Sequence, residues 1–221
     1  MGKDTLEAVG ALYCCASRLR LGLPCQEQLP EYCACNAKLE DDYAHFLSCS
    51  KLKGTAMTTR HDWLVNLLAK FFRDAGAVVH VEPRIFGTVR KRPDLDILLP
   101  NRQLLVDVTV VHPAAPSRKS KIRLSAAAAA ETKKHRDYSS LARLHGASLS
   151  AFAVETYGGF GKQAGELLTL LQQTLRYSSS GGSSNRGIPE ALAVALQQGN
   201  ALVMRTGALA ARRVEGDFGD V

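Results

Sequence analysis

Apolar residues recur at helical spacing in the segment that begins near residue 58. An apolar side chain stands at every third or fourth position there: Leu64, Leu67, Leu68, Phe71 and Ala75. This spacing predicts an amphipathic helix, which Gly76 ends. Residues 4–21 and 164–175 show the same period, and the Ala-rich segments 122–144 and 188–212 predict two longer helices.

Four shorter apolar runs lie between these helices and predict strands at residues 78–81, 95–99, 104–111 and 149–154. In the second run, Asp94 and Asp96 alternate with apolar residues. The third run is almost continuously apolar, as in a strand that is buried on both faces, yet it contains Asp107. The order is helix, three strands, helix, strand, helix, so we predict an α/β domain with an αβββαβα core over residues 57–177.

The rest of the chain divides into four smaller parts. Residues 1–24 are a helical segment, and residues 25–56 lack periodicity but are rich in Cys, Pro, Asn and acidic residues. We expect the latter to form a small knuckle that is held together by something other than apolar burial. Residues 178–187 are a Ser/Gly linker, and residues 188–221 form a C-terminal helix and tail.

Composition is that of a globular chain. Hydrophobic residues make up 46% of the 221 residues and charged residues 22%, and no apolar run reaches the roughly 18 residues of a membrane span. We therefore expect no membrane partner. Six cysteines without a signal peptide favour an intracellular protein, nuclear or cytoplasmic, over a secreted one. The excess of 28 Lys and Arg over 21 Asp and Glu, net +7, suits a polyanionic partner.

The knuckle contains three thiols and one imidazole at compact spacing. Its ligand candidates are Cys33, Cys35, His45 and Cys49. Three thiolates and an imidazole are the ligands of a closed tetrahedral Zn²⁺ site, so we predict a structural zinc ion. Two alternatives stay open: Cys25 could replace one ligand, or the thiols could be free and buried while His45 caps a turn.

Two carboxylates, Asp94 and Asp107, lie on successive predicted strands and could meet at one Mg²⁺ ion. Burying an ionised Asp107 in an apolar strand would cost on the order of several kcal/mol unless a cation or strong hydrogen-bond donors contacted it. Glu82, at the end of the first strand, could join the ligands. Alternatively, Asp107 is only hydrogen-bonded to nearby backbone.

Lys134 lies on the apolar stripe of the helix over residues 122–144. It shares that stripe with Tyr138, Leu141 and His145, whereas the neighbouring Lys133 is rotated by about 100° toward solvent. A lysine facing the sheet could orient a water molecule or neutralise negative charge. The alternative is a snorkelling lysine that covers apolar surface.

Further basic residues are candidates for phosphate contacts. Arg60 and His61, near the start of the first domain helix, could contact phosphate or the carboxylate site, or lie on the surface. Loops flanking the strands hold the others: Arg90, Lys91, Arg92, Arg118, Lys119 and Lys121. The glycines of residues 158–162 do not form a phosphate loop, because Thr156 and Gln163 replace the Gly and Ser or Thr that it requires.

These motifs together resemble the restriction-endonuclease-like domain at the C-terminal end of site-specific non-LTR retrotransposon proteins, with its preceding Cys-Cys-His-Cys knuckle. The resemblance covers about residues 20–176. It implies a fold like that of the PD-(D/E)xK nucleases, in which the catalytic lysine has moved from the third strand, where this chain has Thr109, to the following helix. That implication assigns catalytic roles to Asp94, Asp107 and Lys134, with Tyr138 in support.

The resemblance further implies a metal-dependent endonuclease that nicks target DNA, with the knuckle positioning the duplex. Element RNA and a reverse transcriptase module, in cis or in trans, are the other implied partners. Two departures stand out: the family's Arg-His motif usually continues with Asn where this chain has Asp62, and no polymerase precedes residue 1. The alternative is a catalytically inactive remnant that binds nucleic acid through its knuckle and basic loops.

Overall fold

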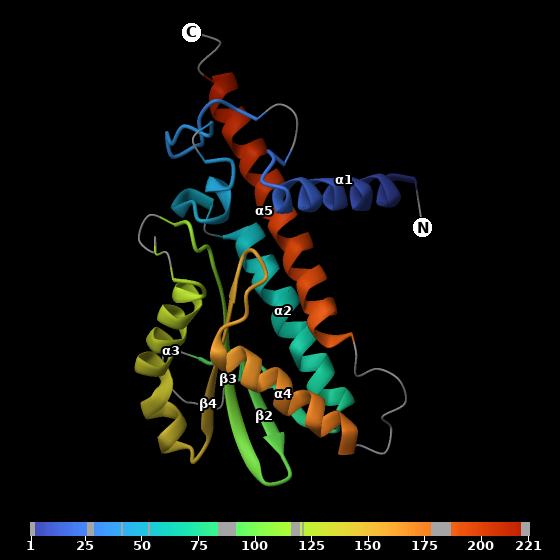
Figure 1. Cartoon of the computed structure of the whole chain (residues 1–221), viewed down its shortest axis with the longest axis vertical. Helices are drawn as coiled ribbons and strands as arrows, with labels where there is room; N and C mark the ends of the chain where they lie inside the picture. Colours follow the sequence, from blue (N-terminus) through green and yellow to red (C-terminus); the bar gives the residue numbers. More distant parts are fainter. Residues whose placement is uncertain are drawn as a thin grey trace. The chain divides into compact units, whose positions relative to one another are not determined.

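The computed structural model shows a mixed α/β protein (Figure 1). It describes residues 3–25, 29–40, 42–52, 54–83, 92–115, 120, 122–177 and 187–217. These divide into two compact units, one formed by Met1–Arg60 with Val194–Val221 and the other by His61–Ala193. No helix in the described part of the chain is both long and apolar enough to cross a bilayer.

The helices are α1 (Lys3–Arg20), α2 (Thr55–Asp74), α3 (Ser125–Leu144), α4 (Lys162–Tyr177) and α5 (Ile188–Asp217), with short 3₁₀ turns at His45–Leu47 and Ser50–Leu52. The strands are β1 (Val78–Val81), β2 (Leu95–Leu99), β3 (Arg102–Val111) and β4 (Ser148–Glu155). From α2 to α4 the order is the predicted one: helix, three strands, helix, strand, helix.

The four strands form one mixed sheet in the order β1-β2-β3-β4. The first three are antiparallel neighbours, and a tight turn at residues 100–101 pairs Leu99 with Arg102, so β3 begins two residues earlier than predicted. Strand β4 runs parallel to β3, and Leu104 pairs with Ser148. A parallel pair needs a crossover connection, which here contains α3.

Helix α3 covers one face of β3 and β4. Near its C-terminal end, Tyr138, Leu141 and Ala142 pack on Leu105, and near its N-terminal end its alanines pack on Val111 and Ala153. Small alanine side chains allow the helix to approach the sheet closely. Helices α2 and α4 lie on the other side of the sheet (Figure 1). The helix begins at Ser125 and not at residue 122, because Leu124 adopts a left-handed conformation with φ 59°.

The other unit has its own small core. Cys15 and Leu19 of α1, Phe46 and Leu47 of the knuckle, and Met204 of α5 belong to one buried cluster. This grouping differs from the sequence prediction, which treated the N-terminal helix, the knuckle and the C-terminal helix as separate parts. The division also falls inside α2 and inside α5. Residues 178–186 of the predicted linker lie outside the described residues.

Candidate functional sites

The predicted ligands of the knuckle lie together. One potential ligand atom from each of Cys33, Cys35, His45 and Cys49 lies within 4.8 Å of the other three. The Sγ atoms of Cys33 and Cys49 are 3.6 Å apart, and Cys35 Sγ is 3.1 Å from His45 Nε2. Tetrahedral geometry at a Zn–S distance of about 2.3 Å puts two ligand sulfurs roughly 3.7 Å apart. The cluster could therefore hold a metal ion such as zinc.

Local backbone structure explains how these ligands meet. A tight turn brings the N–H of Asn36 to the carbonyl of Cys33, and a bridge between Tyr32 and Lys38 closes the loop that carries Cys33 and Cys35. His45 begins the first 3₁₀ turn, and Cys49 lies directly before the second. Burial raises the pKa of the Cys33 thiol to about 12, with Cys49 and Cys35 acting in the same direction against a backbone hydrogen bond. Crowded thiols of this kind favour a bound cation, which stabilises thiolates. Cys25 is not part of this group of four.

The two predicted strand carboxylates lie next to each other in the second unit. The last pair of the β2–β3 ladder is Leu95 with Val106, so one step further Asp94 faces Asp107. Asp94 Oδ2 accepts the backbone N–H of Val108 at 2.6 Å, which fixes the first carboxylate to the strand that carries the second. Asp107 is buried, with 2% of its side chain exposed, whereas 17% of the Asp94 side chain is exposed.

Lys134 reaches this pair from α3. Its Nζ lies 2.5 Å from Asp107 Oδ2, and its side chain is 24% exposed. The neighbouring Lys133 is exposed, as the helical period predicts. Tyr138, one turn later, donates its hydroxyl to the carbonyl of Arg92 at 3.0 Å, and its ring lies 5.8 Å from Lys134 Nζ. The chain just before β2, strand β3 and helix α3 thus bring two carboxylates and one ammonium group together.

The electrostatics of the pair follow from burial and mutual charge. Burial raises the pKa of the Asp107 carboxyl, the charge of Asp94 raises it further, and Lys134 and Tyr138 act in the opposite direction. Burial, with the charge and hydrogen bond of Asp107, also raises the pKa of Tyr138, so its hydroxyl stays protonated. A cation beside the two carboxylates would favour their ionised forms.

His61 is the fifth ionisable group here. Its Nε2 lies 3.2 Å from Asp94 Oδ2, and its Nδ1 lies 3.0 Å from Asp62 Oδ1. Burial alone would lower the pKa of His61, but the hydrogen bonds and charges of Asp94 and Asp62 outweigh it and raise the pKa to about 9. Of the roles considered for His61, the structure places it at the carboxylate site. Asp62, which departs from the Asn of the resembling family, orients the ring.

Glu82 and Arg92 both lie next to Asp94. Arg92 precedes it by two residues in the chain, and Glu82 is opposite it where β1 pairs with β2. The backbone N–H of Glu82 donates to the carbonyl of Asp94 at 2.8 Å, and Glu82 has φ 46°, in the left-handed region. Both side chains are exposed. The other predicted phosphate contacts, Arg90, Lys91, Arg118, Lys119 and Lys121, lie outside the described residues.

Arg60 does not fit its predicted role as a phosphate contact. It is 4% exposed, and its Nη1 donates to Asn200 Oδ1 of α5 at 2.8 Å. Burial lowers the pKa of Arg60 to about 10, so the guanidinium remains charged at neutral pH. We therefore reassign Arg60 to the packing of its own unit. The sequence contained no signal for this, because Asn200 is 140 residues away.

Acidic side chains that the sequence did not single out cap two helices of the second unit. Glu155 Oε1 accepts the N–H of Ala127 in the first turn of α3, and Glu131 Oε1 accepts the N–H of Gln163 in the first turn of α4. Both carboxylates are buried and compensate the partial positive charge of a helix N-terminus. They therefore fix the helix that carries Lys134 relative to the sheet.

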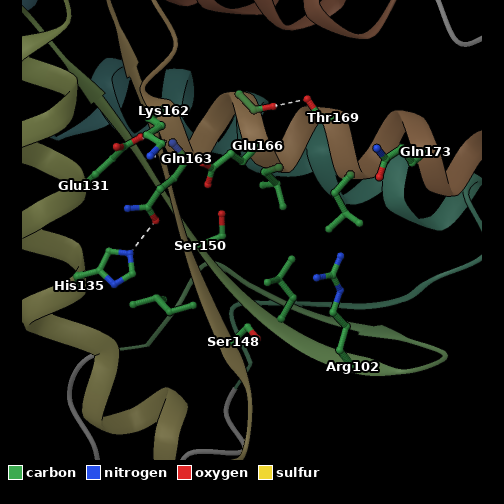
Figure 2. A pocket seen from close by; sticks show the side chains of 15 residues that line it. Arg102, Glu131, His135, Ser148, Ser150, Lys162, Gln163, Glu166, Thr169 and Gln173 are labelled. Carbon is green, nitrogen blue, oxygen red and sulfur yellow. Dashed lines mark hydrogen bonds and ion pairs between the residues drawn. The ribbon is translucent and has the colours of Figure 1, made fainter.

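A groove of about 1000 Å³ lies beside β4, between α3 and α4 (Figure 2). Gln163 crosses it: its Oε1 lies 2.6 Å from His135 Nε2 and accepts the backbone N–H of Ala151 at 3.1 Å. Asp94, Asp107 and Lys134 do not line this groove. The candidate site on the sheet is thus separate from it.

No model of a known protein family matches the sequence, and no curated protein matches it.

Proposed function

We propose that this protein is a metal-dependent DNA endonuclease of the PD-(D/E)xK type. The observation that carries the proposal is the meeting of Asp94, Asp107 and Lys134 at one point of the sheet, from the start of β2, from β3 and from α3. A buried carboxylate that faces a second carboxylate is unfavourable without positive charge beside it, and a divalent cation would add to the charge that Lys134 and His61 supply. The element order and the mixed sheet also support the restriction-endonuclease-like fold that the resemblance implies.

The two carboxylates suit a divalent cation. Mg²⁺ is usually held by one or two carboxylates, with water and substrate phosphate in its remaining positions. Asp94 and Asp107 would supply the protein ligands. The cation, when bound, would lower the pKa of a water molecule and neutralise charge on the phosphate.

The protein's own groups would do the rest. Lys134 would hold the attacking water in line with the phosphorus atom or neutralise charge on a non-bridging oxygen, and Asp107 Oδ2 aims its ammonium group. Tyr138 would keep α3 docked on the chain before β2 through the carbonyl of Arg92. His61 would fix the rotamer of Asp94 from α2.

We also propose that the knuckle binds one structural Zn²⁺ through Cys33, Cys35, His45 and Cys49. The distance between the Sγ atoms of Cys33 and Cys49, close to a tetrahedral edge, and the grouping of all four ligand atoms support this. The experiment is elemental analysis of protein purified without chelator. We expect one zinc per chain, and a loss of that zinc in Cys49→Ser. Finding less than a tenth of an equivalent in the wild type would reject the zinc site.

Plasmid nicking tests the endonuclease. We expect purified protein to nick supercoiled DNA in Mg²⁺ but not in EDTA, and Asp107→Ala and Asp94→Ala, purified identically, to lose at least about 100-fold in rate, as removal of a metal ligand implies. Equal nicking by the wild type and Asp107→Ala would mean contamination and would reject the proposal. Salt-dependent DNA binding without any nicking would instead identify the inactive nucleic-acid-binding remnant.

A further inference from the structure

A second buried carboxylate lies on the same face of the sheet as the candidate site. Asp96 of β2 is 1% exposed, and both its oxygens have partners on the flanking strands. Its Oδ2 lies 3.3 Å from Nδ1 of His80 in β1, and its Oδ1 accepts a hydrogen bond from Nε2 of Gln103 in β3 at 2.7 Å. Burying a carboxylate carries a desolvation cost, and the partners of Asp96 are one imidazole and one neutral amide, so a role beyond packing is worth testing.

The position of this group relative to the carboxylate pair follows from strand geometry. Side chains two residues apart on a strand share a face, so Asp96 lies on the face of Asp94, about 7 Å further along β2. The register pairs Asp96 with His80 on one side and with Leu105 on the other. Asp107 follows Leu105 on that same face. His80 and the carboxylate pair therefore form one continuous strip.

This strip is open to solvent at β1. Val78, which shares the face of His80, is 57% exposed, and the His80 side chain is 51% exposed. Helix α3, in contrast, packs on Leu105, Val111 and Ala153 of β3 and β4. If a DNA strand places one phosphate at Asp94 and Asp107, the next phosphate along that strand lies over β1 or over α3. Of these two surfaces, β1 is the exposed one.

We propose that His80 contacts a DNA phosphate next to the scissile one, and that Asp96 and Gln103 position it. Asp96 accepts from Nδ1 and so turns Nε2 away from the sheet. When the ring carries both protons, Nε2 is left free to donate to a phosphate oxygen. His80 is then a contact residue for substrate, and Asp96 and Gln103 act through it. This inference rests on the proposed endonuclease function.

A metal site is a weaker explanation of the same residues. His80 and Asp96 offer only two ligand atoms, and these already face each other. Among the described residues, three or more potential metal ligands lie close together at Cys33, Cys35, His45 and Cys49 in the other unit, and not at His80 and Asp96. A phosphate contact needs only one donor, which the arrangement provides.

The test measures binding and turnover separately. A fluorescein-labelled DNA duplex is titrated with protein in Ca²⁺ across a salt series, and cleavage is measured in Mg²⁺. We expect His80→Ala to raise Kd and KM about 3- to 10-fold with kcat unchanged, and to reduce the slope of log K against log salt by up to about one. His80→Lys should restore Kd to within about 2-fold, because a lysine also binds phosphate. Asp96→Asn should show a smaller loss of the same kind.

Controls separate the possible failures. His145→Ala removes an exposed histidine from the end of α3 and should behave as wild type. A His80→Ala protein with wild-type Kd and salt slope, beside a wild type that nicks DNA, would overturn this inference and leave the endonuclease intact. A fall in kcat at constant KM would overturn it too. A wild type that neither binds nor nicks the duplex would overturn both proposals. His80→Lys keeps the test valid if His80→Ala does not fold.

Discussion

At Asp107, burial and ionisation oppose each other. Asp107 must be buried to face Lys134, yet its burial and the charge of Asp94 both oppose its ionisation. The ion pair with Lys134 offsets only part of that cost. If the proposed cation binds here, it would offset the remaining cost, so substitutions at this site should affect stability and activity differently.

The two adjacent lysines of α3 provide a matched comparison. Lys134→Ala removes the ammonium group at Asp107, whereas Lys133→Ala removes an exposed one at the next position. We expect Lys134→Ala to lower the nicking rate by about 100-fold, on the scale of a lost electrostatic contact in the transition state, and Lys133→Ala to stay within about 2-fold. Rates under single-turnover conditions provide the measurement. Equal effects of the two substitutions would contradict a special role for Lys134.

His61 should make stability depend on pH. Its pKa is about 9 in the folded protein and about 6.5 in the unfolded chain, so the protonated ring contributes its full stabilisation below about pH 6.5 and loses it as pH rises through 9. The contribution is at most about 3–4 kcal/mol, at 1.36 kcal/mol per pKa unit. We expect the difference in unfolding free energy between wild type and His61→Gln to shrink from pH 6 to pH 10 in urea titrations without Mg²⁺. A difference that is constant over this range would show that His61 is not stabilised as an imidazolium ion.

Helical and strand periods made several of these residues predictable. Lys134 could be assigned to the sheet side of its helix, and Lys133 to solvent, from the spacing of Leu141 and Tyr138 alone. The spacing of Asp94 and Asp96 also placed them on one face, although only the structure shows Gln103 and His80 beside Asp96. The burial of Arg60 could not be predicted, because its partner Asn200 comes from the far end of the chain.

Among the helices, α5 shows how a close contact depends on glycine. A Cβ at Gly207 would lie 2.6 Å from Cδ1 of Phe46, and a Cβ at Gly199 would overlap the side chain of Arg60 and lie 3.2 Å from its Cα. Side chains at these positions would push the knuckle and the start of α2 away from α5. Glycine, although unfavourable in a helix, is therefore required here by packing.

Alanine substitutions test this contact. We expect Gly207→Ala to destabilise the protein by about 1–3 kcal/mol, as overpacking does. Gly10→Ala in α1, where a Cβ would meet nothing within 4 Å, should stabilise it by up to about 1 kcal/mol through helix propensity. Thermal unfolding of the two variants and the wild type provides the comparison. A neutral Gly207→Ala would mean that Phe46 can shift without cost.

Elements were predicted more accurately than their ends. Alternating and continuous apolar runs located all four strands, and β1 and β2 have the predicted bounds because turn residues flank them. The start of α3 could not be predicted, since nothing in the sequence marks the left-handed Leu124. Nor could the joint core of α1, the knuckle and α5, because contacts over such sequence distances leave no local period.

Charge is unevenly divided along the whole molecule. Residues 25–56 contain five acidic and three basic side chains and have a net charge of −2. Because the whole chain has a net charge of +7, the remaining residues together carry +9. Three thiolates around one Zn²⁺ would make the knuckle more negative still. This charge weighs against the expected role of the knuckle in positioning the DNA duplex.

The two units should also differ in what stabilises them. The unit with the knuckle would depend on a bound metal, whereas the other has a sheet whose strands β3 and β4 pack against α3. We expect a zinc chelator to increase amide exchange at residues 29–52 by at least 10-fold and to leave β3 and β4 protected. Hydrogen exchange with mass spectrometry measures both in one sample. Unchanged exchange at residues 29–52 after chelation would show that the knuckle holds without metal.

The side chain of Gln163 has a consequence for solubility. Strand β4 ends the described sheet, and its outer edge is closed by a bridge between Phe160 and Val154 and by the acceptance of the Ala151 N–H by Gln163. An open edge is a template on which another chain can add a strand, and β4 has neither Pro nor Lys to prevent this. Gln163→Ala should therefore leave the fold intact but raise light scattering during concentration. A single side-chain amide on a helix would then help to protect a strand edge from intermolecular pairing.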